Sequence, residues 1–291
     1  MDLAVKEVNK DQISVLNFTN DQLKAYEELI SFIDSEYNPK DCKRALVGAA
    51  GTGKTYLVKA LIKNSKCSYS TIGLAAPTHK ACRVLAESIN IPSIKVKTLQ
   101  SDLGLKLNFD IEKFDINNPP FDPKGRVKID DYKIYIVDEA SMIPRGLCMF
   151  LEKICVSKKC KIIYIGDKYQ LPPVGEKYSS AFKNIKICEL KQIVRQNDTN
   201  PIRKLLTLLR QDIDNKSFHF LEYIYRHPIE FDENNIEGYK CCNYEEFKQI
   251  VYNNFNDEEL TRNVDFVKLL GYTNENINGW NKFIRNCIIK D

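Results

Sequence analysis

The feature that most constrains the fold of this chain is a glycine-rich loop at residues 48–55, which reads GAAGTGKT. It fills every fixed position of the pattern G-x-x-x-x-G-K-[ST], in which glycines let the backbone approach a bound phosphate and turn its N–H groups inward. Lys54 can reach the β- and γ-phosphates of a nucleoside triphosphate, and the Thr55 hydroxyl can bind Mg²⁺. The predicted nucleotide-binding residues are Gly48, Ala49, Ala50, Gly51, Thr52, Gly53, Lys54 and Thr55.

The residues on either side of this loop supply the elements that the pattern requires. Residues 44–47 are apolar enough for a short buried strand, and residues 54–63 have apolar side chains at helical spacing. Strand, loop and helix is the arrangement in which this motif works, because the helix then directs its positive dipole end at the phosphates. The alternative, a chance glycine turn, is disfavoured by these flanks.

Composition limits the compartment and the partners. Lys and Arg total 43 against 39 Asp and Glu, so the formal net charge is +4, which permits nucleic-acid binding without arguing for it. The 10 cysteines include no C-x-x-C pair, and we interpret most of them as small buried apolar residues in a reducing compartment, not as zinc ligands. Residues 1–10 do not resemble a signal peptide, and no apolar run reaches the roughly 20 residues that span a bilayer. We therefore expect a cytoplasmic protein with no membrane partner, in the host cytoplasm if it is viral.

Further apolar runs at residues 69–76, 133–137 and 161–165 predict buried strands, and helical patterns fall between them. Alternating strands and helices predict an α/β fold with a parallel sheet covered by helices on both faces. Ligands bind at the carboxyl ends of the strands in such sheets. Gly48, Pro77, Asp138 and Asp167 all fall at predicted strand ends, so one site can contain them.

Polar residues at these strand ends indicate a hydrolytic site. We predict that Asp138 binds Mg²⁺ and that Glu139 is the general base for the attacking water. Gln170 can reach the γ-phosphate, and Arg195 can supply positive charge to the transition state. The alternatives are a surface acidic pair, a plain proline-bearing turn at Gln170 and a solvated surface arginine.

Taken together, these motifs resemble those of superfamily 1 DNA helicases of the RecD-like, 5′-to-3′ branch, and most closely the Dda-type helicases of T-even phages. The matching motifs occur in the same order as in the family over about residues 15–285: TNDQ at 19–22, GAAGTGKT at 48–55, APTHKA at 76–81, TLQS at 98–101, DEASM at 138–142, GDKYQ at 166–170, VRQ at 194–196 and YTN at 272–274.

The resemblance implies a RecA-like P-loop NTPase with a role for each matching residue. Gln22 would read adenine, Gln170 would couple ATP to DNA, and Arg195 would touch the γ-phosphate from across the cleft. The implied track for single-stranded DNA is lined by Pro77, Thr78, His79 and Thr98. The implied cofactors are ATP and Mg²⁺, and the implied partners are single-stranded and fork DNA and replication proteins.

The resemblance also implies domain boundaries. Residues 1–18 would be a lead-in, residues 19–102 and 132–196 the first RecA-like ATPase domain, and residues 197–291 part of a second one. In this last part, the apolar run at residues 264–270 predicts a strand. Turn signals within residues 103–131 predict a small hairpin-like insertion, where this family carries its strand-separating pin. Phe109, Phe114 or Phe121 could present an aromatic face to a base there, and the alternative for each ring is a place in the local core.

Nothing after residue 274 matches the later motifs of this family, including the one that carries its final arginine. Three interpretations stay open: a truncated or split helicase, a remnant that binds without unwinding, and a chain that needs a partner chain for the missing half. We expect an ATP-dependent DNA helicase, or its N-terminal portion. One alternative is a non-catalytic ATP- and nucleic-acid-binding module. Another is a P-loop kinase or metabolic NTPase, against which stand Asp138 and Glu139 together with the motif around Gln170, since kinases do not need this combination.

Overall fold

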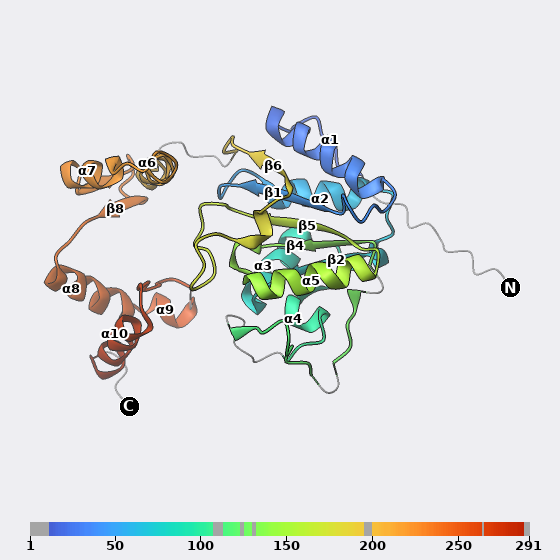
Figure 1. Ribbon diagram of the computed structural model, residues 1–291. Coiled ribbons are helices and arrows are strands. Elements are labelled where there is room, and N and C mark those ends of the chain that lie inside the picture. The colour runs from blue at the N-terminus through green and yellow to red at the C-terminus, as the bar shows by residue number, and fades with distance from the viewer. Residues whose placement is uncertain are drawn as a thin grey trace. The chain divides into compact units, whose positions relative to one another are not determined.

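The computed structural model describes residues 12–106, 113–122, 125–129, 132–194, 200–263 and 265–287. The chain divides into two compact units, Met1–Gln196 and Asn197–Asp291 (Figure 1). Within the described ranges, no helix combines the length and the apolar character that crossing a bilayer requires.

A six-stranded sheet organises the N-terminal unit. Its strands are β1 (Lys43–Gly48), β2 (Ile72–Ala76), β3 (Val96–Thr98), β4 (Ile134–Val137), β5 (Lys161–Gly166) and β6 (Lys186–Leu190). They lie in the order β3-β2-β4-β5-β1-β6, and each neighbouring pair is parallel. The prediction of an α/β fold with a parallel sheet is therefore confirmed.

Helices cover both faces of this sheet (Figure 1). One face carries α1 (Asn20–Asp34), α2 (Lys54–Asn64) and α3 (His79–Ile89), and the other carries α4 (Leu99–Asp102) and α5 (Arg145–Ser157). The 3₁₀ turns η1 (Tyr69–Thr71), η4 (Ala140–Met142) and η5 (Ser180–Phe182) lie in the connections. The apolar core forms two clusters: the first lies between the sheet and α1, α2 and α3, and the second lies between the sheet and α4 and α5. Because strand side chains alternate between faces, Leu46 packs in the first cluster and Ala45 and Val47 pack in the second.

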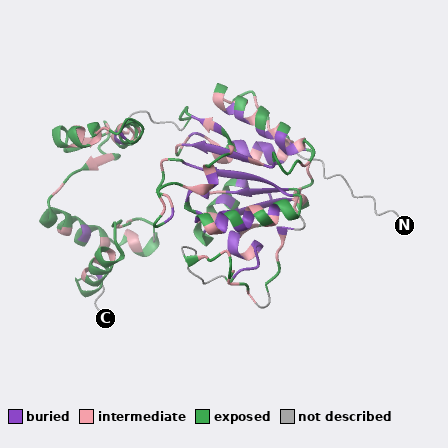
Figure 2. Ribbon diagram, viewed as in Figure 1, coloured by how far each residue is buried: buried purple, intermediate pink, exposed green. Residues whose placement is uncertain are grey.

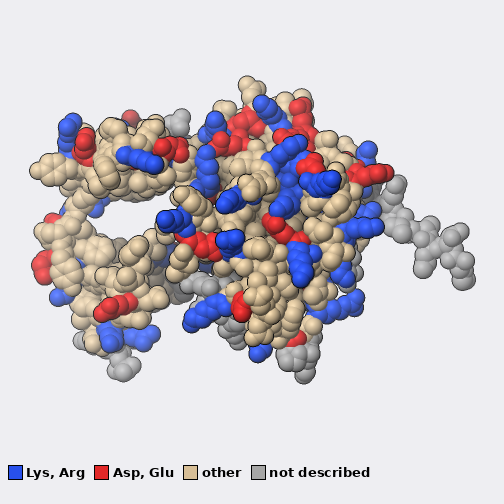
Figure 3. Space-filling model, in the orientation of Figure 1, with Lys and Arg blue, Asp and Glu red and all other residues tan. Residues whose placement is uncertain are grey.

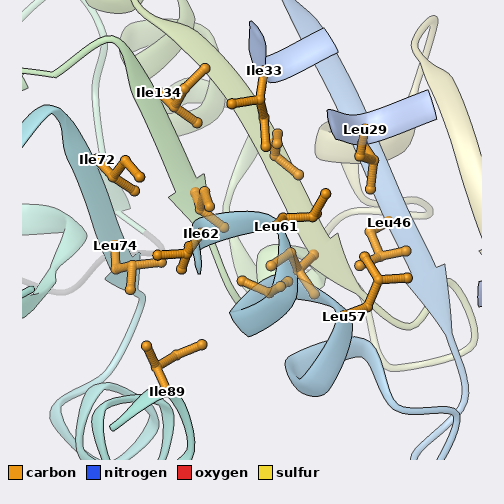
Figure 4. Close-up of a cluster of buried hydrophobic side chains, with 14 of the residues drawn as sticks. Leu29, Ile33, Leu46, Leu57, Leu61, Ile62, Ile72, Leu74, Ile89 and Ile134 are labelled. Carbon is orange, nitrogen blue, oxygen red and sulfur yellow. The ribbon is translucent and has the colours of Figure 1, made fainter. Parts of the chain in front are cut away.

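β1, β2, β4 and β5 are buried on both sides, whereas the outer helices are buried along one stripe (Figure 2). In the first cluster, Leu57 and Leu61 of α2 face Leu46 of β1 and Leu29 of α1 (Figure 4). The apolar runs of the sequence are thus explained by two-sided burial, which is typical of parallel strands.

The two ends of α1 are satisfied in different ways, the first by local sequence and the second by a residue distant in sequence. Thr19 caps the helix and forms a capping box with Gln22, in which each side chain bonds the backbone N–H of the other. At the other end, the buried ammonium of Lys161 donates hydrogen bonds to the carbonyls of Phe32 (2.7 Å) and Ile33 (3.2 Å). A lysine from β5 therefore satisfies helix-terminal carbonyls that have no partner within the helix.

The predicted insertion is described in part. Leu105 and Phe121 form an isolated antiparallel bridge, and the Lys106 N–H donates to the Pro120 carbonyl at 2.8 Å. The Leu105 side chain is fully buried in the second core cluster. Phe109 lies outside the described residues.

The C-terminal unit is built differently. It contains α6 (Pro201–Asn215), α7 (His219–Arg226), α8 (Tyr244–Phe255), α9 (Glu259–Arg262), α10 (Asn274–Cys287) and an antiparallel hairpin of β7 (Ile229–Phe231) and β8 (Gly238–Lys240). Of its described apolar side chains, the buried ones are Leu205, Val251 and Ile284.

The strand predicted at residues 264–270 is wrong for the part that is described. Residues 265–270 form a turn, a bend and irregular backbone, and Leu270 is exposed. An isolated strand leaves its backbone groups unpaired, and β7 and β8, the strands described in this unit, pair with each other. The motif at residues 272–274 leads directly into helix α10.

Candidate nucleotide site

The loop at residues 48–55 has a backbone that requires glycine. Gly51 and Gly53 adopt φ values of +81° and +82°, in the left-handed region that other residues rarely occupy. A Cβ on Gly53 would lie 2.5 Å from the Gln22 Nε2, and one on Gly48 would lie 2.8 Å from the Leu190 carbonyl oxygen. The loop therefore has the close backbone approach that a phosphate cradle needs.

The side chains of the loop are ordered by its own carbonyls. The Lys54 Nζ donates to the carbonyl oxygens of Gly48 (2.7 Å) and Ala49 (2.9 Å), and the Thr52 hydroxyl donates to the same Ala49 oxygen at 2.9 Å. Helix α2 begins at Lys54, so Thr55 lies in its first turn. The Lys54 ammonium, the Thr55 hydroxyl and the positive end of the α2 dipole therefore all lie at this loop.

Gln22, predicted to read adenine, is buried and bonded within the chain. Its Nε2 donates to the Thr52 carbonyl at 2.8 Å, and its Oε1 accepts from the Thr19 N–H at 3.0 Å. The side chain thus joins the start of α1 to the phosphate loop. Recognition of adenine by Gln22 stays a prediction. The structure adds the hydrogen bond by which Gln22 stabilises the phosphate loop at Thr52.

The predicted acidic pair follows β4. The Asp138 N–H donates to the Ala75 carbonyl, and the Glu139 N–H donates to the Asp138 Oδ1, each at 2.9 Å. Burial raises the pKa of both carboxyls, and the charge of Asp138 raises the pKa of Glu139 further. The positive charge of Lys54 lowers both pKa values in part, so the ammonium acts on the two carboxylates.

Gln170 is held between two polar groups. The Ser141 hydroxyl donates to the Gln170 Oε1 at 2.8 Å, and a hydrogen bond from Gln170 lowers the pKa of Glu139. Ser141 is almost fully buried. Sequence analysis did not assign it a role, although its position two residues after Glu139 in the DEASM word is a signal that could have found it.

Sheet order brings these groups together. β5 lies between β4 and β1, so the carboxyl ends of three neighbouring strands carry the acidic pair, Gln170 and the phosphate loop. Arg195 lies outside the described residues. The segment before it is attached at this edge, because the Val194 N–H donates to the Gly51 carbonyl at 2.9 Å. Asp21, which sequence analysis did not single out, accepts from the Lys191 N–H at 2.6 Å and the Gln192 N–H at 2.9 Å.

The residues predicted to line a DNA track divide by exposure. Thr78 and His79 are exposed at the start of α3, and the Thr78 Oγ1 accepts the Ala81 N–H at 3.2 Å. Pro77 and Thr98 are buried, and the Thr98 hydroxyl caps α4. Figure 3 shows Lys and Arg interspersed with Asp and Glu on the visible face, so charge alone does not mark a track in that view.

Phe114 packs against the core. Its ring centroid lies 5.4 Å from that of Phe150, and the more exposed Phe121 lies 5.9 Å from the same ring. Phe114 also packs against the second core cluster. This packing favours the local-core alternative for Phe114.

Comparison with known proteins yields a family match. The family model described as an AAA domain matches residues 19–224. The RecD subunit of the RecBCD enzyme from Buchnera aphidicola subsp. Schizaphis graminum is 36% identical over an alignment of 159 residues that covers 48% of this chain and 24% of that protein. The ATP-dependent RecD2 DNA helicase of Deinococcus radiodurans is 29% identical over 205 residues, 68% of this chain and 23% of that protein. An uncharacterised protein of Acanthamoeba polyphaga mimivirus is 32% identical over an alignment of 155 residues that covers 48% of this chain and 31% of that protein. This chain spans less than half the length of each of them.

Solved structures show the same fold. The Pif1 helicase of Candida albicans superposes with a TM-score of 0.52 at 22% identity, over 82% of this chain and 54% of that chain. The Bacteroides sp. Pif1 in complex with ADP-AlF4 superposes with a TM-score of 0.51 at 19% identity, over 85% of this chain and 58% of that chain.

Proposed function

This chain belongs to the AAA domain family, in the RecD-like branch of the superfamily 1 helicases, and from that premise we propose that it is the ATP-hydrolysing motor part of a 5′-to-3′ DNA helicase. The observation that carries the proposal is the convergence of Lys54, Glu139 and Gln170 at the ends of three neighbouring parallel strands. A site for phosphate binding alone needs the loop, whereas hydrolysis also needs a base and a group that orients water.

Each residue of the site has a part in this chemistry. The loop N–H groups and Lys54 bind the β- and γ-phosphates, and Glu139 accepts a proton from the attacking water. Gln170, held by Ser141, orients that water and responds to the γ-phosphate. Arg195 adds positive charge as the γ-phosphoryl group transfers.

The oxygen donors of the site fit a hard divalent cation. The Thr55 hydroxyl and the Asp138 carboxylate are ligands that Mg²⁺ accepts together with phosphate oxygens. Bound Mg²⁺ would supply charge neutralisation at the β- and γ-phosphates. In this assignment Thr55 and Asp138 orient the ion and Lys54 binds the phosphate directly.

ATP hydrolysis with and without single-stranded DNA tests the activity. We expect turnover that DNA stimulates and that Lys54→Ala reduces at least about a hundredfold, since this lysine contacts the charge that develops on the phosphates. Lys63→Ala, at the opposite end of α2, is the matched control and should keep the turnover of the unchanged chain. Turnover that survives Lys54→Ala would refute the assignment, and nucleotide binding without turnover would indicate a non-catalytic module.

The exposed Thr78 and His79 at the start of α3 support a nucleic-acid track beside this site, because helix N-termini bind phosphate. Fork substrates with a single 5′ or a single 3′ tail test the direction. We expect unwinding from the 5′ tail, and preferential unwinding from the 3′ tail would contradict it. His79→Ala should weaken binding to single-stranded DNA, whereas Lys63→Ala should not.

A further inference from the structure

Asp21 joins the start of α1 to the segment that follows β6. Its Oδ2 accepts two consecutive backbone N–H groups, from Lys191 at 2.6 Å and from Gln192 at 2.9 Å. Its Oδ1 accepts the Gln22 N–H at 2.9 Å and is also contacted by the Thr19 hydroxyl. One carboxylate therefore serves two chain segments that are 170 residues apart in sequence.

The same two segments also hold the phosphate loop. The Val194 N–H donates to the Gly51 carbonyl at 2.9 Å, and the Gln22 Nε2 donates to the Thr52 carbonyl at 2.8 Å. Two successive loop carbonyls are thus bonded from outside the loop. In a trans peptide the N–H points opposite to the carbonyl, so the bond at Thr52 directs the Gly53 N–H to the other side, where a phosphate would bind.

We propose that Asp21 is a positioning residue that fastens residues 191–194 to the nucleotide loop, so that the shape of the loop and the placement of the segment preceding Arg195 change together. The inference rests on the proposed ATPase function for its consequence, because Arg195 is the predicted contact to the γ-phosphate. Its structural part, a segment held by Asp21 and by Gly51, does not depend on turnover.

Geometry favours this role over simple helix capping. The Gln22 N–H at the start of α1 is shared by the Thr19 hydroxyl at 3.3 Å and the Asp21 Oδ1 at 2.9 Å, so capping uses one of the two Asp21 oxygens and leaves Oδ2 for other partners. The two bonds to Lys191 and Gln192 leave the helix altogether and add nothing to its backbone pairing. Hydrogen bonds to a charged acceptor are the stronger kind, which suits a contact that must hold a segment in place.

Hydrogen–deuterium exchange of the full chain tests the fastening directly. We expect the amides of Lys191, Gln192 and Val194 to exchange slowly, and ADP with Mg²⁺ to slow them further. In Asp21→Ala these amides should exchange about tenfold faster or more, and ADP should no longer slow them. Glu27→Ala, which removes an exposed carboxylate from the same helix, is the matched control and should change neither.

ATP turnover separates positioning from stability. In Asp21→Ala we expect the kcat of DNA-stimulated turnover to fall about tenfold while the KM for ATP changes by less than about twofold. Asp21→Asn keeps one acceptor oxygen and should be intermediate in both exchange and turnover, and it replaces Asp21→Ala if that variant does not fold.

Two results would overturn the inference: unchanged exchange at residues 191–194 in both variants, or faster exchange there with unchanged kcat. Failure of the proposed function is distinct, because it would show as absent turnover in the unchanged chain while the exchange measurement remains informative.

Discussion

At the scale of single residues, Gly53 and Gly175 make a matched pair. Their φ values are +82° and +79°, but a Cβ on Gly53 would meet the Gln22 amide at 2.5 Å, whereas one on Gly175 would have no neighbour within 4 Å. Alanine at either position costs about 1 kcal/mol of backbone strain. Alanine at Gly53 must also displace Gln22, which braces the loop through Thr52.

We therefore expect Gly53→Ala to weaken ATP binding by about tenfold or more, and Gly175→Ala to leave it within about twofold. Titration with a fluorescent ATP analogue measures both, and thermal unfolding reports the strain that the two variants share. Equal loss of ATP affinity in the two variants would show that the contact between Gly53 and Gln22 does not matter.

Ser141 is expected to act through Gln170. Its hydroxyl is the donor to the Gln170 Oε1, so Ser141→Ala frees the amide to rotate away from Glu139. Losing one such bond costs about 1 kcal/mol, which predicts a kcat about fivefold lower with an unchanged KM for ATP. The double-mutant cycle with Gln170→Ala is decisive: Ser141→Ala should cost nothing more once Gln170 is gone, and additive losses would show that Ser141 acts elsewhere.

At the scale of elements, the join between α1 and residues 191–192 should depend on pH. Burial tends to raise the pKa of Asp21, but hydrogen bonds from Thr19 and from three backbone amides outweigh it and hold the pKa below 3.8. A carboxyl whose pKa is lowered on folding contributes stability above its unfolded pKa and loses it as the pH falls through the folded value.

Thermal unfolding of the unchanged chain and of Asp21→Asn should therefore differ by about 2–4 °C at pH 7 and converge as the pH falls below 3.8. Glu27→Gln removes a similar charge without these bonds and should match the unchanged chain throughout. A difference that persists undiminished at the lowest pH would mean that the charge of Asp21 is not its source.

Element by element, the strands that the sequence predicts are those buried on both faces. β4 and β5 are continuous apolar runs because helices cover them on either side. β6 was missed, since it lies at the sheet edge with its first two residues exposed and mixes Lys and Glu with apolar residues. The strand predicted at residues 264–270 is wrong although the segment is apolar enough for a strand. Among the described residues, residues 265–270 have no strand to pair with.

At the scale of the whole molecule, the sequence predicts those site residues that directly follow a strand. It does not predict the side-chain contacts that depend on how distant segments align when the helices pack on the sheet. Lys54 and Glu139 follow strands, and parallel strands end at one edge of a sheet, so their meeting follows from the α/β pattern. The contacts of Asp21 with Lys191 and of Ser141 with Gln170 join distant segments through single hydrogen bonds. No local pattern records such pairs, because they depend on how the packed layers align.

The unequal cores of the two units lead to the last prediction. Both core clusters consist of residues from Met1–Gln196, whereas the described apolar side chains buried in Asn197–Asp291 are Leu205, Val251 and Ile284. Burial of apolar side chains is the main favourable contribution to folding, at about 1.5–3 kcal/mol for a large side chain.

A chain of residues 1–196 should therefore unfold cooperatively by calorimetry and bind ATP with the affinity of the full chain, while residues 197–291 alone should show a weak, broad transition. Lys63→Ala and Glu27→Ala remain available as controls, because both residues lie within the shorter chain. A sharp calorimetric transition for residues 197–291 would contradict the stability expected from its few buried apolar side chains. Loss of ATP binding by residues 1–196 would show that the nucleotide site depends on the C-terminal unit.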